Sequence, residues 1–363
     1  MTNEKSHEVH HGLENILVAE TEISDVQGTK GVLVIRGYAV EELAELSPFA
    51  STAALVWRGD LPSRKDEEEL SRALGTARVR LFADVARLAR TIPLPASPLE
   101  FQRAALSVLT EADPVWVTST MAVAAAIWYR VQAQLPLIEP DAALSHSADF
   151  LRMLSGQNAT VVATQALDRY LTTVSDHGMN ASTFAARVVA STGSDLISAV
   201  AAGLGALKGP LHGGAPGLVL DMLDAIGAPA EAAAWIEHQL AQGHRIMGMG
   251  HRIYKVRDPR AAVLEKALET LEQAGVASRR LALARAVEQV AASSLKKKYP
   301  GRELHANVEF YTAVLLDALG ISREVFTATF AMGRVLGWCA HFTEQTLKGR
   351  LIRPDSRYVG KTR

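Results

Sequence analysis

Two histidines lie in sequence contexts that can hold an imidazole in a fixed position. His212 stands in LKGPLHGGAPG, residues 207–217, where glycines let other groups approach closely and prolines fix the backbone. A neutral imidazole there can donate a hydrogen bond to a carbonyl oxygen, although a turn histidine often has only a structural partner. His251 follows two glycines in MGMGHRIYKVRDPRA, residues 247–261. These two side chains are the first candidates for chemistry.

A carboxylate and a third histidine lie at expected helix starts. Asn307 can cap a helix in ANVEFY, which places Glu309 in the first turn beside aromatic residues. There Glu309 either satisfies the helix dipole or, if partly buried, is ready to accept a proton. His177 precedes Asn180 in SDHGMNAST, and a capped helix start explains that pattern equally well.

Three arginines stand where a cation gains little from its own surroundings. Arg260 falls in the first turn of a helix that Asp258 is expected to cap, so its charge opposes the helix dipole. Arg334 interrupts the apolar run FAMGRVLGW, and Arg353 lies near the end in LIRPDSRYVG. A buried charge must be paired, so each arginine meets either a protein carboxylate or an anionic ligand. For Arg260, a surface arginine paired with a nearby acid is the alternative.

The elements that position these residues are expected to be helices. Only GVLVIRG, residues 31–37, has the β-branched run of a strand, whereas the proline-free interval 141–209 predicts several consecutive buried helices. Residues 217–320 are richer in charge and predict amphipathic helices, and 326–345 is again almost wholly apolar.

These patterns predict an all-α fold with two domains and a minor N-terminal β element. The large helical domain comprises residues 1–216 and 321–363, and the small helical domain, residues 217–320, is inserted into it. A cleft between the domains then places the stretch around His212 near the hinge.

Composition narrows the range of partners. The chain has 363 residues with 39 acidic and 38 basic side chains, so no global field favours nucleic acid or an anionic membrane. Cys339 is the only cysteine, which excludes an intramolecular disulfide and cysteine-cluster metal sites. The polar start and the lack of a membrane-length apolar run predict a cytoplasmic protein.

No metal site or bound cofactor is expected. The three histidines never occur at the HExxH spacing. GLGALKG, residues 203–209, has the glycine spacing of a dinucleotide loop, but it follows helical sequence where that fingerprint requires a strand.

Five motifs resemble those of the citrate synthase family: DHGMNASTFAARV, LKGPLHGGAP, MGMGHRIYKVRDPRA, ANVEFY and FAMGRVLGW. The opening GLENILVAETEISDVQGTKGVLVIRGY is also similar, so the likeness runs from about Gly12 to Gly360. PGRELHANVEFY and the short length are most similar to the shorter bacterial type. The resemblance implies a helical homodimeric transferase of the tricarboxylic acid cycle. Such an enzyme condenses oxaloacetate with acetyl-CoA and hydrolyses citryl-CoA, with no cofactor besides its acetyl-CoA co-substrate.

The resemblance also implies roles for individual residues. Glu309 is the base that removes a methyl proton from the acetyl thioester, His212 donates a hydrogen bond to the thioester oxygen, and His251 polarises and protonates the oxaloacetate carbonyl. The implied oxaloacetate ligands are His177, His251, Arg260, Arg334 and, from the other subunit, Arg353. The implied CoA contacts are Met247, Gly248, Met249 and Gly250 at the adenine and Lys255 at a phosphate.

Two alternatives stay open. A 2-methylcitrate synthase uses propionyl-CoA by the same chemistry, and one methylene is worth only about 1 to 3 kcal/mol in a pocket. Many family members carry aspartate where this chain has Glu309, which leaves the choice of acyl-CoA open. A catalytically silent helical paralogue is the other alternative, and the presence of His212, His251 and Glu309 together counts against it.

Overall fold

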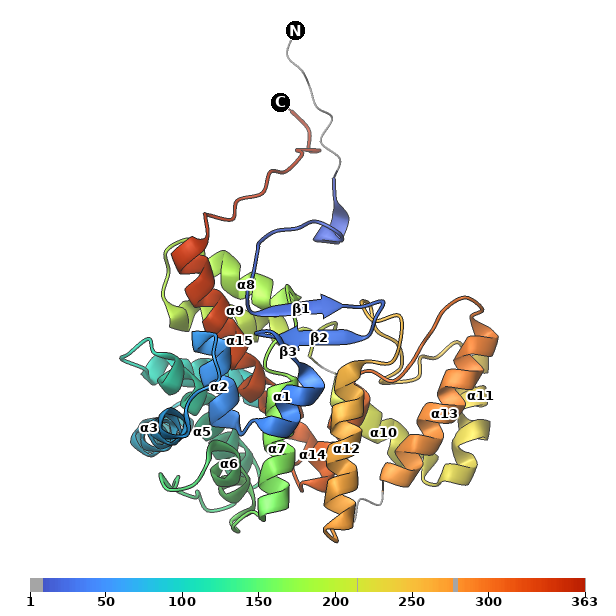
Figure 1. Cartoon of the computed structure of the whole chain (residues 1–363), viewed down its shortest axis with the longest axis horizontal. Helices are drawn as coiled ribbons and strands as arrows, with labels where there is room; N and C mark the ends of the chain where they lie inside the picture. The colour runs from blue at the N-terminus through green and yellow to red at the C-terminus, as the bar shows by residue number, and fades with distance from the viewer. Residues whose placement is uncertain (1–8, 214, 277–279, 363) are drawn as a thin grey trace.

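The computed structural model describes residues 9–213, 215–276 and 280–362 (Figure 1). Within these ranges fifteen α-helices and a few short 3-10 turns accompany one three-stranded sheet. The expected all-α fold with a minor N-terminal β element is therefore confirmed. None of the helices in the described ranges has the length and apolarity that crossing a membrane requires.

The sheet is an antiparallel hairpin with a short third strand. Its strands are β1 (Ser24–Gln27), β2 (Val32–Ile35) and β3 (Tyr38–Ala39), in that order across the sheet. In β2, Leu33 and Ile35 are fully buried and anchor the hairpin to the core. The stretch predicted as strand contains β2, whereas β1 and β3 were not predicted.

The helices before residue 208 and the last helix form one packed body. Side-chain caps from Ser63, Ser145, Thr160, Asn180 and Asp195 begin five of these helices. The members are α1 (Val40–Leu46), α2 (Phe49–Arg58), α3 (Arg64–Thr91), α4 (Pro98–Ala105), α5 (Pro114–Gln132), α6 (His146–Ser155), α7 (Val161–Thr173), α8 (Ala181–Ala190), α9 (Leu196–Leu207) and α15 (Phe326–Lys348). The proline-free interval is thus helical, as predicted.

Helix α15 lies at the centre of this body and packs on α5, α7, α8 and α9. Two glycines on α15 pack against the last turn of α7 and the segment that follows it. A Cβ added at Gly333 would lie 2.7 Å from the Leu171 carbonyl oxygen, and one at Gly337 would lie 2.4 Å from Asp176 Oδ1. The backbone N–H of Gly337 also donates to the carbonyl of Ser175. The chain leading to His177 is therefore held directly against the backbone of α15.

The charged middle interval forms a second group of helices, drawn yellow to orange in Figure 1. They are α10 (Ala215–Ile226), α11 (Ala232–Ala241), α12 (Pro259–Gln273), α13 (Leu281–Lys298) and α14 (Val308–Ala318). Helix α14 packs on α10 and α12, and α12 in turn packs on α1 and α7 of the first body. The predicted domain boundaries at 217 and 320 fall in the first turn of α10 and just after α14, and they stay a prediction.

Candidate active site

A cavity of about 870 Å³ lies where segments from both groups of helices meet. Its walls include residues that sequence analysis took from motifs far apart in the chain: His177, His212, Gly250, His251, Lys255, Arg260, Glu309 and Arg334. The fold therefore brings the three predicted catalytic side chains and three predicted arginine and histidine ligands into one space.

The remaining predicted residues lie elsewhere in this chain. Met247, Gly248 and Met249 belong to the loop that reaches the cavity at Gly250, but they are not among its lining residues. Arg353 is exposed on the extended segment that leaves α15, which Figure 1 draws running away from the helices. Its predicted place in the partner's site stays a prediction.

The loop 247–250 is docked against the start of α14. Gly250 donates its N–H to the carbonyl of His305 at 2.7 Å, and Asn307 donates to the carbonyl of Gly248 at 2.9 Å. Gly248 has φ of 72°, and a Cβ there would lie 2.8 Å from Phe310 Cβ. Only glycine fits this position without displacing α14.

Glu309 lies in the first turn of α14, where it was expected. Asn307 caps the helix, accepting the Glu309 N–H at 3.0 Å, and its amide group donates to the Gly250 carbonyl at 2.9 Å. Burial raises the pKa of Glu309 to about 7, outweighing the opposing effect of Arg260. A carboxyl with that pKa can exchange a proton at neutral pH.

His251 is held as a neutral hydrogen-bond donor. Its Nδ1 accepts the backbone N–H groups of Ile253 at 3.0 Å and Tyr254 at 3.1 Å, so the neutral ring carries its proton on Nε2. Burial and then Arg260 lower the pKa of His251 to about 4, so the ring is uncharged at neutral pH. Because Arg260 Nη2, 3.4 Å from Nε2, is itself a donor, the Nε2 proton is left for another acceptor.

His177 is buried beside His251. Its Nε2 lies 3.1 Å from the Tyr254 hydroxyl, and the two imidazole rings meet edge to face with centroids 5.6 Å apart. Burial, followed by Arg260 and Arg334, holds the pKa of His177 well below its ordinary value. It too is neutral at neutral pH.

His212 lies in a turn after α9, and its Nε2 is 2.9 Å from Ser182 Oγ. That hydroxyl accepts the Trp338 indole N–H at 3.1 Å, and it can donate its own proton either to Asn180 Oδ1, at 2.8 Å, or to His212. The serine has one proton, and when this proton points to His212, Nε2 accepts it and Nδ1 is the protonated nitrogen. Burial and then Arg334 lower the pKa of His212 to about 4.

Arg260 and Arg334 are both buried cations. The alternative of a surface position for Arg260 is wrong, because its side chain is 3% exposed. It pairs through Nε and Nη2 with Asp258, which caps α12 as predicted. Arg334 donates from Nε to the Val174 carbonyl at 2.7 Å and stacks over Phe330.

The terminal nitrogens of Arg334 are the feature that points to a ligand. Among the described residues no acceptor is recorded for Nη1 or Nη2, although Arg334 lines the cavity. Burial lowers the pKa of Arg334 to about 10, so it remains a cation at neutral pH. Two buried guanidinium groups on one cavity suit a small dicarboxylate.

Sequence reasoning missed several residues of the site. Ser182 was not among the predicted residues, although its hydroxyl contacts His212. The N-terminal segment 12–18 supplies one wall of the cavity, which a motif match alone did not indicate. Within the described ranges, no group of three or more histidine, cysteine or acidic side chains could hold a metal ion.

Comparison with known proteins agrees with these features. The family described as citrate synthase, C-terminal domain, matches residues 12–355. The chain is 36% identical to the citrate synthase of Haloferax volcanii over 98% of this chain and 97% of that one. It is 34% identical to a 2-methylcitrate synthase of Mycobacterium tuberculosis, covering 97% and 91% of the two chains. A ternary complex of Thermoplasma acidophilum citrate synthase with carboxymethyl coenzyme A and oxaloacetate matches with a TM-score of 0.88, 28% identity and 98% and 97% coverage.

Proposed function

The chain belongs to the citrate synthase family and is a transferase of the citrate synthase type, and we propose that its substrates are oxaloacetate and acetyl-CoA. One observation carries the assignment of residues. Neutral histidines, a glutamate with a raised pKa and two buried arginines line one cavity. The reaction condenses the two substrates and hydrolyses citryl-CoA to citrate and CoA.

Oxaloacetate binds through charge and orientation. Arg260 and Arg334 bind its carboxylates, and His177 adds a hydrogen bond beside them. His251 donates its Nε2 proton to the keto oxygen, which withdraws electrons from the carbon to be attacked. The fixed tautomer of His251 supports this role, because two backbone N–H groups occupy Nδ1.

Glu309 and His212 activate the acetyl group. Glu309 removes a proton from the methyl carbon, and His212 donates a hydrogen bond from Nδ1 to the thioester oxygen as negative charge develops there. The enolate carbon then attacks the keto carbon, and the keto oxygen takes the Nε2 proton of His251. The methyl proton held by Glu309 returns to His251 through water, so both residues regain their starting state. Water finally cleaves the thioester bond: its hydroxyl group joins the acyl carbon and its proton goes to the CoA sulfur, which releases citrate and CoA.

The CoA portion extends toward the loop before His251. We place the adenine beside Met247, Gly248, Met249 and Gly250, and a phosphate at Lys255, whose position on the cavity wall supports this placement. The reaction needs no resident cofactor. A cytoplasmic location is part of the same proposal, and the single cysteine supports it, because a chain with one cysteine has no intramolecular disulfide to maintain.

Steady-state kinetics with the two acyl-CoA substrates test the assignment. We expect kcat/KM with oxaloacetate to be higher for acetyl-CoA than for propionyl-CoA, by about 10- to 100-fold if one methylene decides. CoA release is followed with a thiol reagent. The reverse preference would identify a 2-methylcitrate synthase, which the similarity to the Mycobacterium tuberculosis enzyme keeps in view. No CoA release with either substrate would indicate the silent paralogue.

We further propose a homodimer in which Arg353 of each subunit completes the partner's site. Its exposure on a segment that leaves the body of its own chain supports this proposal. Arg353→Ala is expected to weaken oxaloacetate binding about 10- to 100-fold, the range for hydrogen bonds to charged groups.

A complementation experiment tests whether Arg353 acts across subunits. Mixed after partial unfolding and reassembly, Arg353→Ala and His251→Ala protomers form heterodimers with one intact site, so activity is expected to exceed that of either variant alone. In the control mixture, Arg353→Ala is replaced by Arg72→Ala, a substitution of an exposed arginine. This mixture gives the activity expected when the partner of the His251→Ala protomer is fully active. No gain on mixing would mean that Arg353 serves its own chain or neither.

A further inference from the structure

We propose that the hairpin formed by β1 and β2 is a strut that holds two substrate-binding loops in place relative to each other. One end contacts residues 176–178 around His177, and its turn contacts residues 253–256 beside His251. Ser24 and Gly28 are the positioning residues, and neither lines the cavity. The inference builds on the proposed function, because it concerns the loops that bind oxaloacetate.

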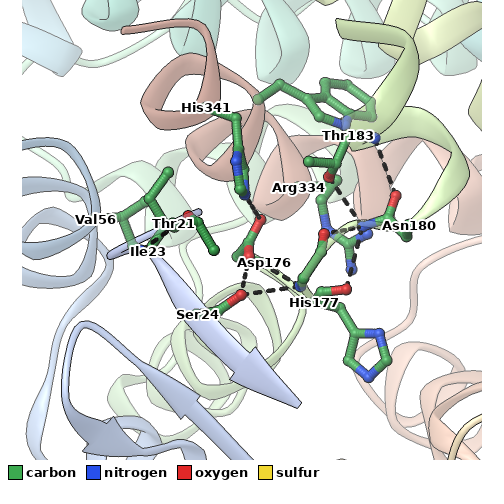
Figure 2. Close-up of polar contacts among 12 residues, drawn as sticks. Thr21, Ile23, Ser24, Val56, Asp176, His177, Asn180, Thr183, Arg334 and His341 are labelled. Carbon is green, nitrogen blue, oxygen red and sulfur yellow. Dashed lines mark hydrogen bonds and ion pairs between the residues drawn. The ribbon is translucent and has the colours of Figure 1, made fainter. Parts of the chain in front are cut away.

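The Ser24 end is visible in Figure 2, where the serine lies against Asp176. Its hydroxyl donates to Asp176 Oδ2 and accepts the Gly178 N–H at 2.9 Å. Gly178 has φ of 58°, and a Cβ there would lie 3.1 Å from Val26 Cγ2 of the same strand. One serine thus bonds to the residue before His177 and to the residue after it.

Asp176 connects this contact to the centre of the protein. It is fully buried, and its Oδ1 lies 3.3 Å from His341 Nε2, whose ring accepts a hydrogen bond from Arg187 at 2.9 Å on its other nitrogen. Its negative charge also stabilises the positive charge of Arg334, because it raises the pKa of Arg334 against the effect of burial. A shift of Asp176 would therefore disturb two residues of the proposed oxaloacetate site, its chain neighbour His177 and Arg334.

The turn end is packed backbone to backbone. The Lys255 N–H donates to the Gly28 carbonyl at 3.0 Å, and a Cβ at Gly28 would lie 2.4 Å from the Ile253 carbonyl oxygen. A Cβ at Gly31 would lie 2.6 Å from Val256 Cγ2. The segment held here supplies the N–H groups that fix the His251 tautomer.

The two ends are close enough for one rigid element to join them. Four residues of strand span only about 13 Å, at the ordinary rise of an extended chain. Two flanking residues of β2, Leu33 and Ile35, are fully buried, so the hairpin is fixed to the core. The loop of His177 and the loop of His251 come from different groups of helices, and the hairpin contacts both.

Ser24→Ala is the first test. We expect its KM for oxaloacetate to rise about 10-fold, as loss of hydrogen bonds at a buried carboxylate implies, with the KM for acetyl-CoA unchanged. Ser24→Thr keeps the hydroxyl and should restore the wild-type value. Asp25→Ala is the matched control, because Asp25 is the exposed neighbour on β1 and bonds to Gln27.

Hydrogen exchange supplies a readout that does not depend on catalysis. Ser24→Ala should speed amide exchange in residues 176–180, and Gly28→Ala should speed it in residues 251–257 and lower kcat. If Ser24→Ala and Gly28→Ala had the same amide exchange rates and the same KM for oxaloacetate as Asp25→Ala, the proposal that the hairpin is a strut would be overturned. Wild-type protein that neither binds nor consumes oxaloacetate would instead refute the proposed function, while the exchange measurements would still decide the inference.

Discussion

Replacing Glu309 by glutamine is expected to lower kcat about 10³- to 10⁴-fold, the upper range for a positioned general base. The amide keeps the shape and the Asn307-capped helix start, but it cannot accept a methyl proton. Oxaloacetate binding should be unchanged, because the ligands proposed for it are arginines and histidines and do not include Glu309. Stopped-flow or steady-state release of CoA gives kcat, and calorimetric titration with oxaloacetate gives the dissociation constant.

Matched variants separate the base role from a general loss of charge. Glu303→Gln removes an exposed glutamate that pairs with Lys296 near the same helix start and should leave kcat unchanged. Glu309→Asp retains a carboxylate on a shorter side chain and should keep partial activity. Near-normal turnover by Glu309→Gln would remove this residue from the base role.

The pH dependence of the wild type should have the same origin. The base form of Glu309 is lost as pH falls through its pKa of about 7, so kcat/KM should fall tenfold per pH unit below that value. Because burial raises this pKa above its ordinary 4.5, the folded state binds the proton more tightly than the unfolded state. That stabilising effect is complete below pH 4.5 and is lost as pH rises through about 7. Glu309→Gln should therefore gain stability relative to wild type over this interval, as measured by urea unfolding.

Replacing His212 by alanine is expected to lower kcat about 10²- to 10³-fold, as loss of one oxyanion donor does. The KM for oxaloacetate should change little, since the proposed partner of His212 is the thioester and not the dicarboxylate. Its low pKa supports the prediction, because a neutral ring can donate from Nδ1 without holding a full charge near the thioester.

The Ser182 contact allows a finer test of the same role. Ser182→Ala removes the hydroxyl that can donate to His212 Nε2. The proton of the neutral ring can then move from Nδ1 to Nε2, and Nδ1 can no longer donate to the thioester oxygen. We expect an intermediate fall in kcat, about 10-fold. Exposed His238→Ala is the control and should be neutral. A His212→Ala variant that raises only KM would place His212 in substrate binding rather than in stabilising the developing charge.

The features that could be predicted from the sequence are those that depend on residues close together in the chain. Asp258 and Asn307 were predicted as caps because a capping side chain acts within two or three residues of its own position. The helical interval 141–209 could be predicted equally well, since its lack of proline and its apolar spacing are local properties. The gathering of His212, His251 and Glu309 in one cavity came from motif resemblance, because spacing alone relates no two of them.

What could not be predicted depends on contacts between distant residues. The sequence of β1, SDVQ, has no β-branched run, and the strand exists because β2 pairs with it. The hydrogen bond from Ser24 to Asp176 joins residues 152 positions apart, and no pattern around either residue reveals it. Close approach of Gly28 to Ile253 is likewise decided by packing.

The two glycines of α15 give this helix an unusual relation to the substrate. Neither glycine lines the cavity, yet a methyl group on Gly337 would displace the carboxylate of Asp176, whose charge stabilises the Arg334 cation. Sequence change in such enzymes is ordinarily least tolerated where side chains meet the reacting molecule. Gly333 and Gly337 meet no substrate, but a side chain at either position would collide with the chain leading to His177. We therefore expect variation among relatives to be as restricted at these two glycines as at the histidines of the site.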